Sequence, residues 1–259
     1  MHGPLSLLQY TGACAPGPCS VDRFRAHGDT IAELPHALPD AGILAGSVRD
    51  AAQPMSAPPR VALALTGASG VQYALRLLGC LLDAGCHVYL LVSRPAHVVI
   101  GMDTDLSVPG RTAEMQRFFE QRHADAPGTL EVLGMQQWTA PIASGSGAPD
   151  AMVICPCTTG TLASVASGLC TSLLERAADV VLKERRRLIV MPREMPFSEI
   201  HLENMLRLAR MGAVIMPPNP GFYNHPQSID DLVDFVVARI LDHLDIGQTL
   251  SPRWGIEHE

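Results

Sequence analysis

A run of small and hydroxyl-bearing residues, Thr66-Gly-Ala-Ser-Gly70, follows the first strongly apolar stretch of this 259-residue chain. Its backbone amides can cradle a phosphate at the start of the next helix, and the Ser69 hydroxyl adds a further donor. A dinucleotide fingerprint would need a third glycine, which the continuation Val71-Gln-Tyr73 does not supply. Taken alone, the run fits either a phosphate site or an ordinary tight turn.

Two further groups of donors follow apolar segments. Ser93 comes directly after residues 87–92, and Thr158-Thr-Gly-Thr161 follows the buried run that ends at Cys155. Hydroxyl and amide donors at several strand ends suit the single phosphate of a mononucleotide better than a pyrophosphate.

A more basic set lies later in the chain and includes Lys183, the run 185–187, Arg193, Tyr223 and Arg239. Most of the run around Lys183 is typical of a solvated helix C-terminus, where cations complement the dipole. Arg193 and Glu194 follow an apolar strand instead, so Arg193 could clamp a phosphate through two hydrogen bonds.

Two motifs could suggest metal chemistry. Cys155-Pro-Cys157 lacks both the C-x-x-C spacing and a second Cys/His pair, so we expect buried apolar thiols there. Asp230-Asp-Leu-Val-Asp234 spells D-D-x-x-D, but it opens a helix capped by Ser228, where acids favour the dipole. We expect no metal site.

Composition excludes several classes of protein. Nineteen basic against 26 acidic residues give a net charge of −7, without the basic face that nucleic acid requires. The charge-free run 151–174 contains a proline and many hydroxyl residues, so we expect no membrane span, and the N-terminus has no basic signal region. Seven cysteines, an odd number, favour reduced thiols and a cytoplasmic location.

The elements that must position these residues alternate regularly from residue 60 onward. Continuous apolar strands between helices predict a three-layer, doubly wound parallel sheet, Rossmann-like or flavodoxin-like, with ligands at the carboxyl ends of the strands. We expect residues 1–59 to be a poorly ordered Pro/Ala/Gly-rich extension, with Met55 a possible natural start, and residues 60–259 to form one domain. Strands are expected at 61–65, 87–92, 129–133, 151–154, 188–191 and 213–216; helices at 73–82, 94–102, 111–123, 172–184, 198–211 and 228–244.

Several long strings of this chain, in order from about Arg60 to Trp254, form a specific pattern. They are Thr66-Gly-Ala-Ser-Gly70, Cys155-Pro-Cys157, residues 175–186, Pro192-Arg-Glu194, residues 200–205, residues 212–217, Pro220-Gly-Phe-Tyr223 and Pro226-Gln-Ser228. Together they resemble the flavin prenyltransferases of the UbiX type. The resemblance implies a flavodoxin-like subunit of a dodecamer that makes prenylated FMN from reduced FMN and dimethylallyl phosphate. Partner decarboxylases, one of them in ubiquinone biosynthesis, would receive that product.

The resemblance also implies roles for single residues. Prenyl transfer needs stabilisation of the departing phosphate and π density facing the allylic cation, for which Trp138 and Trp254 are candidates beside the alternative of packed indoles. Asp103 stands where the family usually has a longer Glu; with Glu194 it would handle protons, and Ser69 and Lys183 complete the implied catalytic set. The implied FMN contacts are Gly67, Ala68, Ser69, Ser93, Thr158, Thr159, Gly160, Thr161 and Arg176; the implied dimethylallyl phosphate contacts are Lys183, Arg193, Tyr223 and Arg239.

Three alternatives remain at this point. A cysteine-type flavoprotein decarboxylase would use a catalytic His and an Asn-rich loop, but the loop here reads Pro192-Arg-Glu-Met-Pro-Phe197. A non-catalytic FMN-binding subunit is compatible with the shorter Asp103. An NAD-linked dehydrogenase is disfavoured by the missing glycine and by the lack of a clear Tyr-x-x-x-Lys pair.

Overall fold

A computed structural model describes residues 58–252 of the chain. Nearly all of the expected N-terminal extension, including Met55, therefore lies outside the described residues, and so does Trp254.

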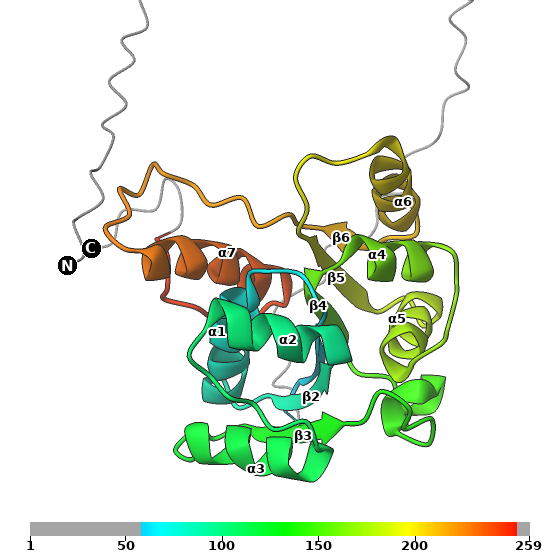
Figure 1. Ribbon diagram of the computed structural model, residues 1–259, viewed down its shortest axis with the longest axis horizontal. Coiled ribbons are helices and arrows are strands. Elements are labelled where there is room, and N and C mark those ends of the chain that lie inside the picture. Colours follow the sequence, from blue (N-terminus) through cyan, green and yellow to red (C-terminus); the bar gives the residue numbers. More distant parts are fainter. Residues whose placement is uncertain (1–57, 253–259) are drawn as a thin grey trace, which may run out of the picture. The chain divides into compact units, whose positions relative to one another are not determined.

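The described residues form one parallel six-stranded sheet with helices on both faces (Figure 1). Its strand order is β3-β2-β1-β4-β5-β6, the Rossmann order of the two that we expected. The elements are β1 (Arg60–Leu65), α1 (Val71–Asp83), β2 (His87–Val92), α2 (Arg94–Asp103), α3 (Thr112–Arg122), β3 (Thr129–Leu133), the 3-10 turns η1 (Pro141–Ala143) and η2 (Gly145–Gly147), β4 (Ala151–Cys157), α4 (Thr159–Ala166), α5 (Leu173–Lys183), β5 (Arg187–Pro192), α6 (Glu199–Arg210), β6 (Val214–Ile215) and α7 (Ile229–His243).

Side chains alternate between two hydrophobic clusters because successive strand residues point to opposite faces of the sheet. In β1, Leu63 and Leu65 belong to the cluster under α1, α2, α3 and α7, whereas Ala62 and Ala64 belong to the cluster under α4, α5 and α6. All four side chains are buried. Figure 1 shows α1 and α7 on one side of the sheet and α4, α5 and α6 on the other. The predicted three-layer architecture is confirmed.

Serine side chains cap the starts of three helices, among them the cap that we expected at Ser228. Ser172 and Ser228 each open a capping box, with Glu175 and Asp231 as the reciprocal partners, and Ser198 caps α6 in the same way. These side chains satisfy amides that would otherwise lack partners in the first helical turn.

The predictions were wrong in one region. The buried strand β4, expected at 151–154, continues through Cys157, and residues 159–166, where we expected no helix, form α4. Thr158 caps this helix, and Leu162, Val165 and Ala166 bury its apolar side. Strands β1 to β3 are added toward one side of the sheet and β4 to β6 toward the other. The topological switch point therefore lies between the loops that follow β1 and β4. No helix in residues 58–252 is long and apolar enough to cross a membrane.

Candidate functional site

Thr66 joins the two loops at the switch point. Its hydroxyl donates to the Pro156 carbonyl (2.8 Å) and accepts from the Thr158 amide (2.8 Å). Thr66 is 2 % exposed, the one buried polar residue among those the structure describes. In the sequence, Thr66 is only the first residue of the turn; its partners lie about 90 residues away, which no local pattern could reveal.

The neighbouring strand ends are tied together in the same way. The Ser93 amide, after β2, donates to the Leu65 carbonyl at the end of β1 (3.0 Å). On the other side, the Arg193 amide, after β5, donates to the Cys157 carbonyl at the end of β4 (3.1 Å). Four consecutive strands, β2-β1-β4-β5, therefore present their carboxyl ends as one continuous edge. The predicted residues that follow them lie along this edge.

The turn after β1 is shaped by close approach to α2. A Cβ atom on Gly67 would lie 2.4 Å from the Cβ of Pro95, so only glycine fits, and Gly70 has φ +102°, a conformation that L side chains rarely adopt. Ala68 is buried, whereas Ser69 is exposed with no hydrogen-bond partner among the described residues. The Ser69 hydroxyl is therefore free to meet a ligand.

Asp103 lies at the end of α2 and anchors this turn. Its carboxylate Oδ2 accepts a hydrogen bond from the Gly70 amide (2.7 Å), and its carbonyl accepts from the Gln72 side chain (2.8 Å). From the sequence, the shorter Asp103 side chain puts in doubt whether its carboxylate reaches the flavin. In the structure it reaches the turn's backbone.

Three helices begin at this edge, and the Asp103 carboxylate already binds the N-cap amide of one of them, α1. The first turns of α1, α2 and α4 contain no acidic residue, whereas those of α3, α5, α6 and α7 each contain at least one. Moreover, the N-cap of α1, Gly70, has no side-chain cap. Because helix N-termini carry partial positive charge and free amides, this edge favours a bound anion.

The predicted hydroxyl residues serve partly as caps. Ser93 Oγ accepts from the Ala96 amide (3.2 Å), and Thr158 Oγ1 accepts from the Thr161 amide (3.2 Å) and lies 2.9 Å from the Thr161 hydroxyl. Thr159 and Gly160 form the exposed first turn of α4, and no atom lies within 4 Å of where a Gly160 Cβ would be. This first turn is open to a ligand.

Arg193 and Glu194 complete the carboxyl edge after β5, and both are exposed. Glu194 Oε1 accepts from the Met195 amide (3.1 Å), which holds the carboxylate close to the backbone. The Arg193 side chain has no ionic partner among the described residues, so its guanidinium is available for an anion.

Lys183 lies at the opposite edge of the sheet. It ends α5, just before β5, and pairs with Glu184, whose pKa this contact lowers. The strand β5 separates Lys183 from Arg193, and its six residues span about 20 Å. One copy of the chain therefore cannot bring Lys183 and Arg193 to the same phosphate.

Arg239 and Tyr223 belong to the α7 side of the sheet. Arg239 forms an ion pair with Asp242 (2.7 Å). It lies one turn before His243, and the His243 carbonyl accepts a hydrogen bond from Arg187 at the start of β5. The Tyr223 ring packs edge-to-face on Phe235 of α7, with ring centroids 5.6 Å apart.

Arg176 on α5 donates to the Ala143 carbonyl (3.0 Å) and pairs with Asp179 (2.7 Å). Trp138 follows β3 and is 45 % exposed, so it is not an ordinary packed core indole. Arg176 is the fourth residue of α5, and this helix begins where the Leu173 amide donates to the Met135 carbonyl, in the same loop after β3 that contains Trp138.

The two motifs that suggested metals have other roles. Cys155 and Cys157 are buried in the two different hydrophobic clusters, and burial raises the pKa of both thiols, so they cannot share a ligand. Asp231 accepts from the Ser228 amide (3.0 Å), and Asp234 pairs with Arg76 (2.6 Å). These acids cap α7 and fix it to α1, as the helix start predicted.

Comparisons with known proteins match most of the chain. The profile of the Flavoprotein family matches residues 50–241. Flavin prenyltransferase UbiX of Pseudomonas aeruginosa is 57% identical over 204 residues, covering 79% of this chain and 98% of that protein. The Methanocaldococcus jannaschii protein of the same name is 42% identical over 196 residues, or 76% of this chain and 98% of that one.

Two solved structures are similar as well. A crystal structure of AnUbiX (PadA1) in complex with FMN and dimethylallyl pyrophosphate has a TM-score of 0.69 and 37% identity, and covers 78% of this chain and 100% of that chain. A dodecameric FMN-dependent Ubix-like decarboxylase from Escherichia coli O157:H7 has a TM-score of 0.64 and 37% identity, covering 75% and 98%.

Proposed function

This chain belongs to the Flavoprotein family and, within it, to the flavin prenyltransferases of the UbiX type, and on that basis we propose its reaction and the roles of its residues. The enzyme transfers a dimethylallyl group from dimethylallyl phosphate to reduced FMN and so makes prenylated FMN. The observation that carries this proposal is the group of three helix N-termini at the switch point whose own first turns contain no acidic residue, in a chain 57% identical to a flavin prenyltransferase.

The FMN phosphate fits the carboxyl edge of the sheet. The turn 67–69, the Ser93 loop and the first turn of α4 from Thr158 to Thr161 supply backbone amides and hydroxyls, and Thr66 fixes their spacing. Arg176 completes the proposed FMN contacts. Bound reduced FMN would supply the nucleophilic ring atoms that accept the prenyl group.

The donor phosphate is held by Lys183, Arg193, Tyr223 and Arg239. Since Lys183 and Arg193 of one copy lie at opposite edges of the sheet, a complete donor site needs residues from more than one copy. We therefore propose a homo-oligomer, a dodecamer as in the E. coli relative, in which neighbouring copies bring these cations together.

Transfer begins when the allylic C–O bond ionises and negative charge develops on the leaving phosphate. Guanidinium and ammonium groups that are already in place stabilise this charge more than they stabilise the bound substrate. Asp103 and Glu194 then handle the proton that the flavin ring loses, and the Ser69 hydroxyl, next in the chain to the Gly70 amide that Asp103 binds, is a further group that can hold or relay it. Exposed aromatic surface such as Trp138 can face the cation.

The proposal has four further parts: the role of metal, the fate of the product, the residues that carry the activity and the location of the enzyme. The cations replace a metal ion at the phosphate, so transfer is metal-independent. The product passes to partner decarboxylases that use prenylated FMN. We assign the activity to residues 60–259, place the enzyme in the cytoplasm, and give residues 1–59 no part in the reaction.

Anaerobic incubation with reduced FMN and dimethylallyl phosphate, followed by mass analysis of the flavin, tests the proposal. The flavin mass should rise by one isoprene unit, with or without a chelator. An unchanged flavin mass would instead support a non-catalytic FMN-binding subunit. Loss of CO₂ from a cysteine-ended substrate would support a cysteine-type decarboxylase.

A further inference from the structure

In the segment that follows α7, residues 244–252, the side chain of Gln248 makes four of the hydrogen bonds that hold the chain in place. Its amide oxygen accepts from the Leu250 amide (2.9 Å) and the Ser251 amide (3.2 Å). Its amide nitrogen donates to the Ser251 carbonyl (3.3 Å) and to Asp242 Oδ1 (3.5 Å). Ile246 and Leu250 pack against the hydrophobic cluster under α7, so the segment is docked along its length.

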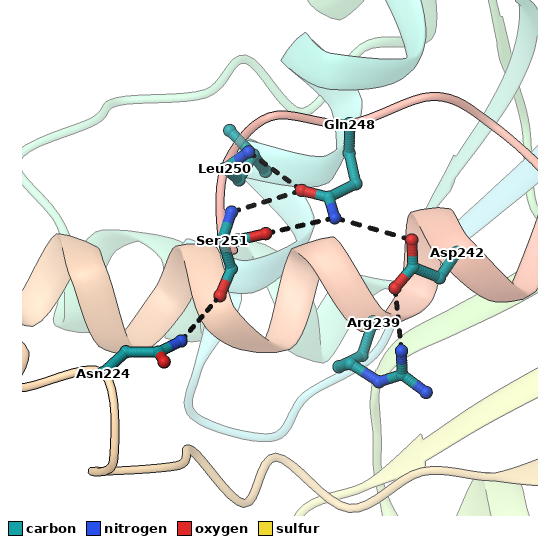
Figure 2. Close-up of polar contacts among 6 residues, drawn as sticks. All are labelled: Asn224, Arg239, Asp242, Gln248, Leu250 and Ser251. Atoms are coloured by element: carbon teal, nitrogen blue, oxygen red, sulfur yellow. Dashed lines mark hydrogen bonds and ion pairs between the residues drawn. The ribbon is translucent and has the colours of Figure 1, made fainter. Parts of the chain in front are cut away.

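Each end of this network lies next to a residue of the proposed donor site. On one side, the second oxygen of Asp242 accepts from Arg239 Nη1 (2.7 Å). On the other side, Asn224, which follows Tyr223 directly, donates to Ser251 Oγ (3.1 Å). Figure 2 shows the resulting path from Arg239 on α7 through Asp242, Gln248 and Ser251 to Asn224.

Along this path, the residue that holds the arginine is buried and the arginine itself is exposed. The Asp242 side chain is 14% exposed, whereas that of Arg239 is 53% exposed. One N–H of the guanidinium is engaged by a nearly buried carboxylate, and the other donors of the fork face outward. An arginine held in this way loses less conformational freedom when it binds a phosphate.

The Tyr223 loop is fixed to the same helix by a second contact. The Tyr223 ring packs on Phe235, and a Cβ on Gly221 would lie 2.7 Å from the Phe235 ring and 2.8 Å from the Tyr223 ring. The loop therefore lies tightly against α7 at Phe235, while Asn224 ties it to the segment 244–252.

We propose that Asp242 and Gln248 are positioning residues for the donor phosphate, because they set the Arg239 guanidinium and the Tyr223 loop in a fixed relation. The inference rests on the proposed function, which makes Arg239 and Tyr223 phosphate contacts. Neither Asp242 nor Gln248 touches substrate; both act through the residues that do. Their loss should weaken donor binding and leave flavin binding unchanged.

The test uses Gln248→Leu and Asp242→Asn in the full chain. We expect the KM for dimethylallyl phosphate to rise about tenfold in each, as for loss of a hydrogen bond to a charged group. The kcat at saturating donor and the Kd for FMN should stay within about twofold of wild type. The double variant should raise KM by less than the product of the single effects, because both residues act in one network.

Two variants serve as controls. Gln116→Leu removes a glutamine that bonds the backbone at Leu130 and Val132, and should lower the Tm without changing the donor KM. Asp245→Asn removes a carboxylate near the same end of α7 that pairs with Arg187, outside the network. If Gln248→Leu and Asp242→Asn change only the Tm, or weaken FMN and donor equally, the proposal is overturned.

A calorimetric titration of the FMN-bound protein with inorganic phosphate separates this inference from the proposed function. Weaker phosphate binding in both variants supports the positioning role even if the wild-type protein transfers no prenyl group, in which case the proposed function alone fails. Phosphate binding equal to wild type, in a wild-type protein that does prenylate FMN, removes the positioning role alone.

Discussion

Asp103 combines two roles that a sequence motif would treat as one. Its carboxylate holds the Gly70 amide at the start of α1, and the same group is the proposed proton carrier beside the flavin turn. The shorter side chain is long enough for the first role, because Oδ2 lies 2.7 Å from the Gly70 amide nitrogen. Substitutions that keep the acceptor oxygen but remove the charge can therefore separate the two roles.

We predict that Asp103→Asn binds FMN like wild type, since the amide oxygen still accepts from Gly70, but transfers the prenyl group about 10²- to 10⁴-fold more slowly. Asp103→Ala should lose rate to a similar extent and also bind FMN about tenfold more weakly, because the turn loses its anchor. Single-turnover assays and FMN titration measure the two effects. Wild-type rates in Asp103→Asn would assign the proton to Glu194 or a bound water.

Thr66 carries the second prediction at this scale. Thr66→Val has nearly the same shape but removes both side-chain hydrogen bonds, which leaves the Thr158 amide without its partner. We expect a loss of about 1–3 kcal/mol in the free energy of unfolding, together with weaker FMN binding. Denaturant unfolding and FMN titration measure these, with Thr66→Ser as a control that keeps the hydroxyl. A valine variant as stable as wild type would show that the two loops are held together in another way.

At the scale of elements, apolar periodicity predicted nearly every strand and helix, because the central strands β1, β2, β4 and β5 are buried on both faces and the helices pack one side against the sheet. Helix α4 was missed for a physical reason. Its sequence, TGTLASVA, contains weak helix formers, and its stability comes from the Thr158 cap and from burial of Leu162 and Val165. Tertiary packing, which local propensity does not include, decides its conformation.

In the site, too, local pattern predicts some features and tertiary structure decides the others. Sequence placed Ser69, Ser93, Thr158 and Arg193 after strands, and the strand ends do bring them to one edge. Lys183 and Arg193 are ten residues apart in the chain, but Lys183 lies at the amino ends of the strands and Arg193 at the carboxyl ends, because the whole of β5 lies between them. Hydrogen bonds across 90 residues, such as those of Thr66, are likewise absent from any local pattern.

The end of helix α3 makes stability depend on pH. His123 follows α3 and packs near Gly79 of α1, and burial, followed by the charge of Arg122, lowers its pKa. On acidification below about pH 6.5 the unfolded chain binds a proton first, so this contribution to stability is present above that pH and is lost as pH falls. We predict that His123→Gln loses less Tm than wild type between pH 7 and pH 5. Parallel Tm curves would show that His123 is not responsible.

At the scale of the whole molecule, the proposed division between an extension and a catalytic domain can be tested directly. The Flavoprotein profile matches residues 50–241, and all of the described elements begin at or after Arg60. A chain that starts at Met55 should therefore fold with an unchanged Tm and prenylate FMN at the wild-type rate. Failure of that shorter chain to fold would place an essential element within residues 1–54.

The separation of the donor cations predicts complementation between inactive subunits. In one copy, Lys183 precedes the start of β5 and Arg193 follows its end, and the strand between them is about 20 Å long. The two cations at any one donor phosphate must therefore come from different copies. Lys183→Ala and Arg193→Ala should each abolish transfer, because every site in either homo-oligomer lacks one cation.

Mixing the two variants before assembly should restore activity. In an equimolar mixture, half of the contributed Lys183 positions and half of the Arg193 positions are intact, so about one quarter of the sites contain both cations. Co-expression with two affinity tags, followed by tandem purification and the flavin mass assay, measures this fraction. Proteins mixed after separate assembly are the control and should remain inactive. No recovery in the co-assembled sample would mean that both cations serve one copy, and the oligomeric donor site would have to be abandoned.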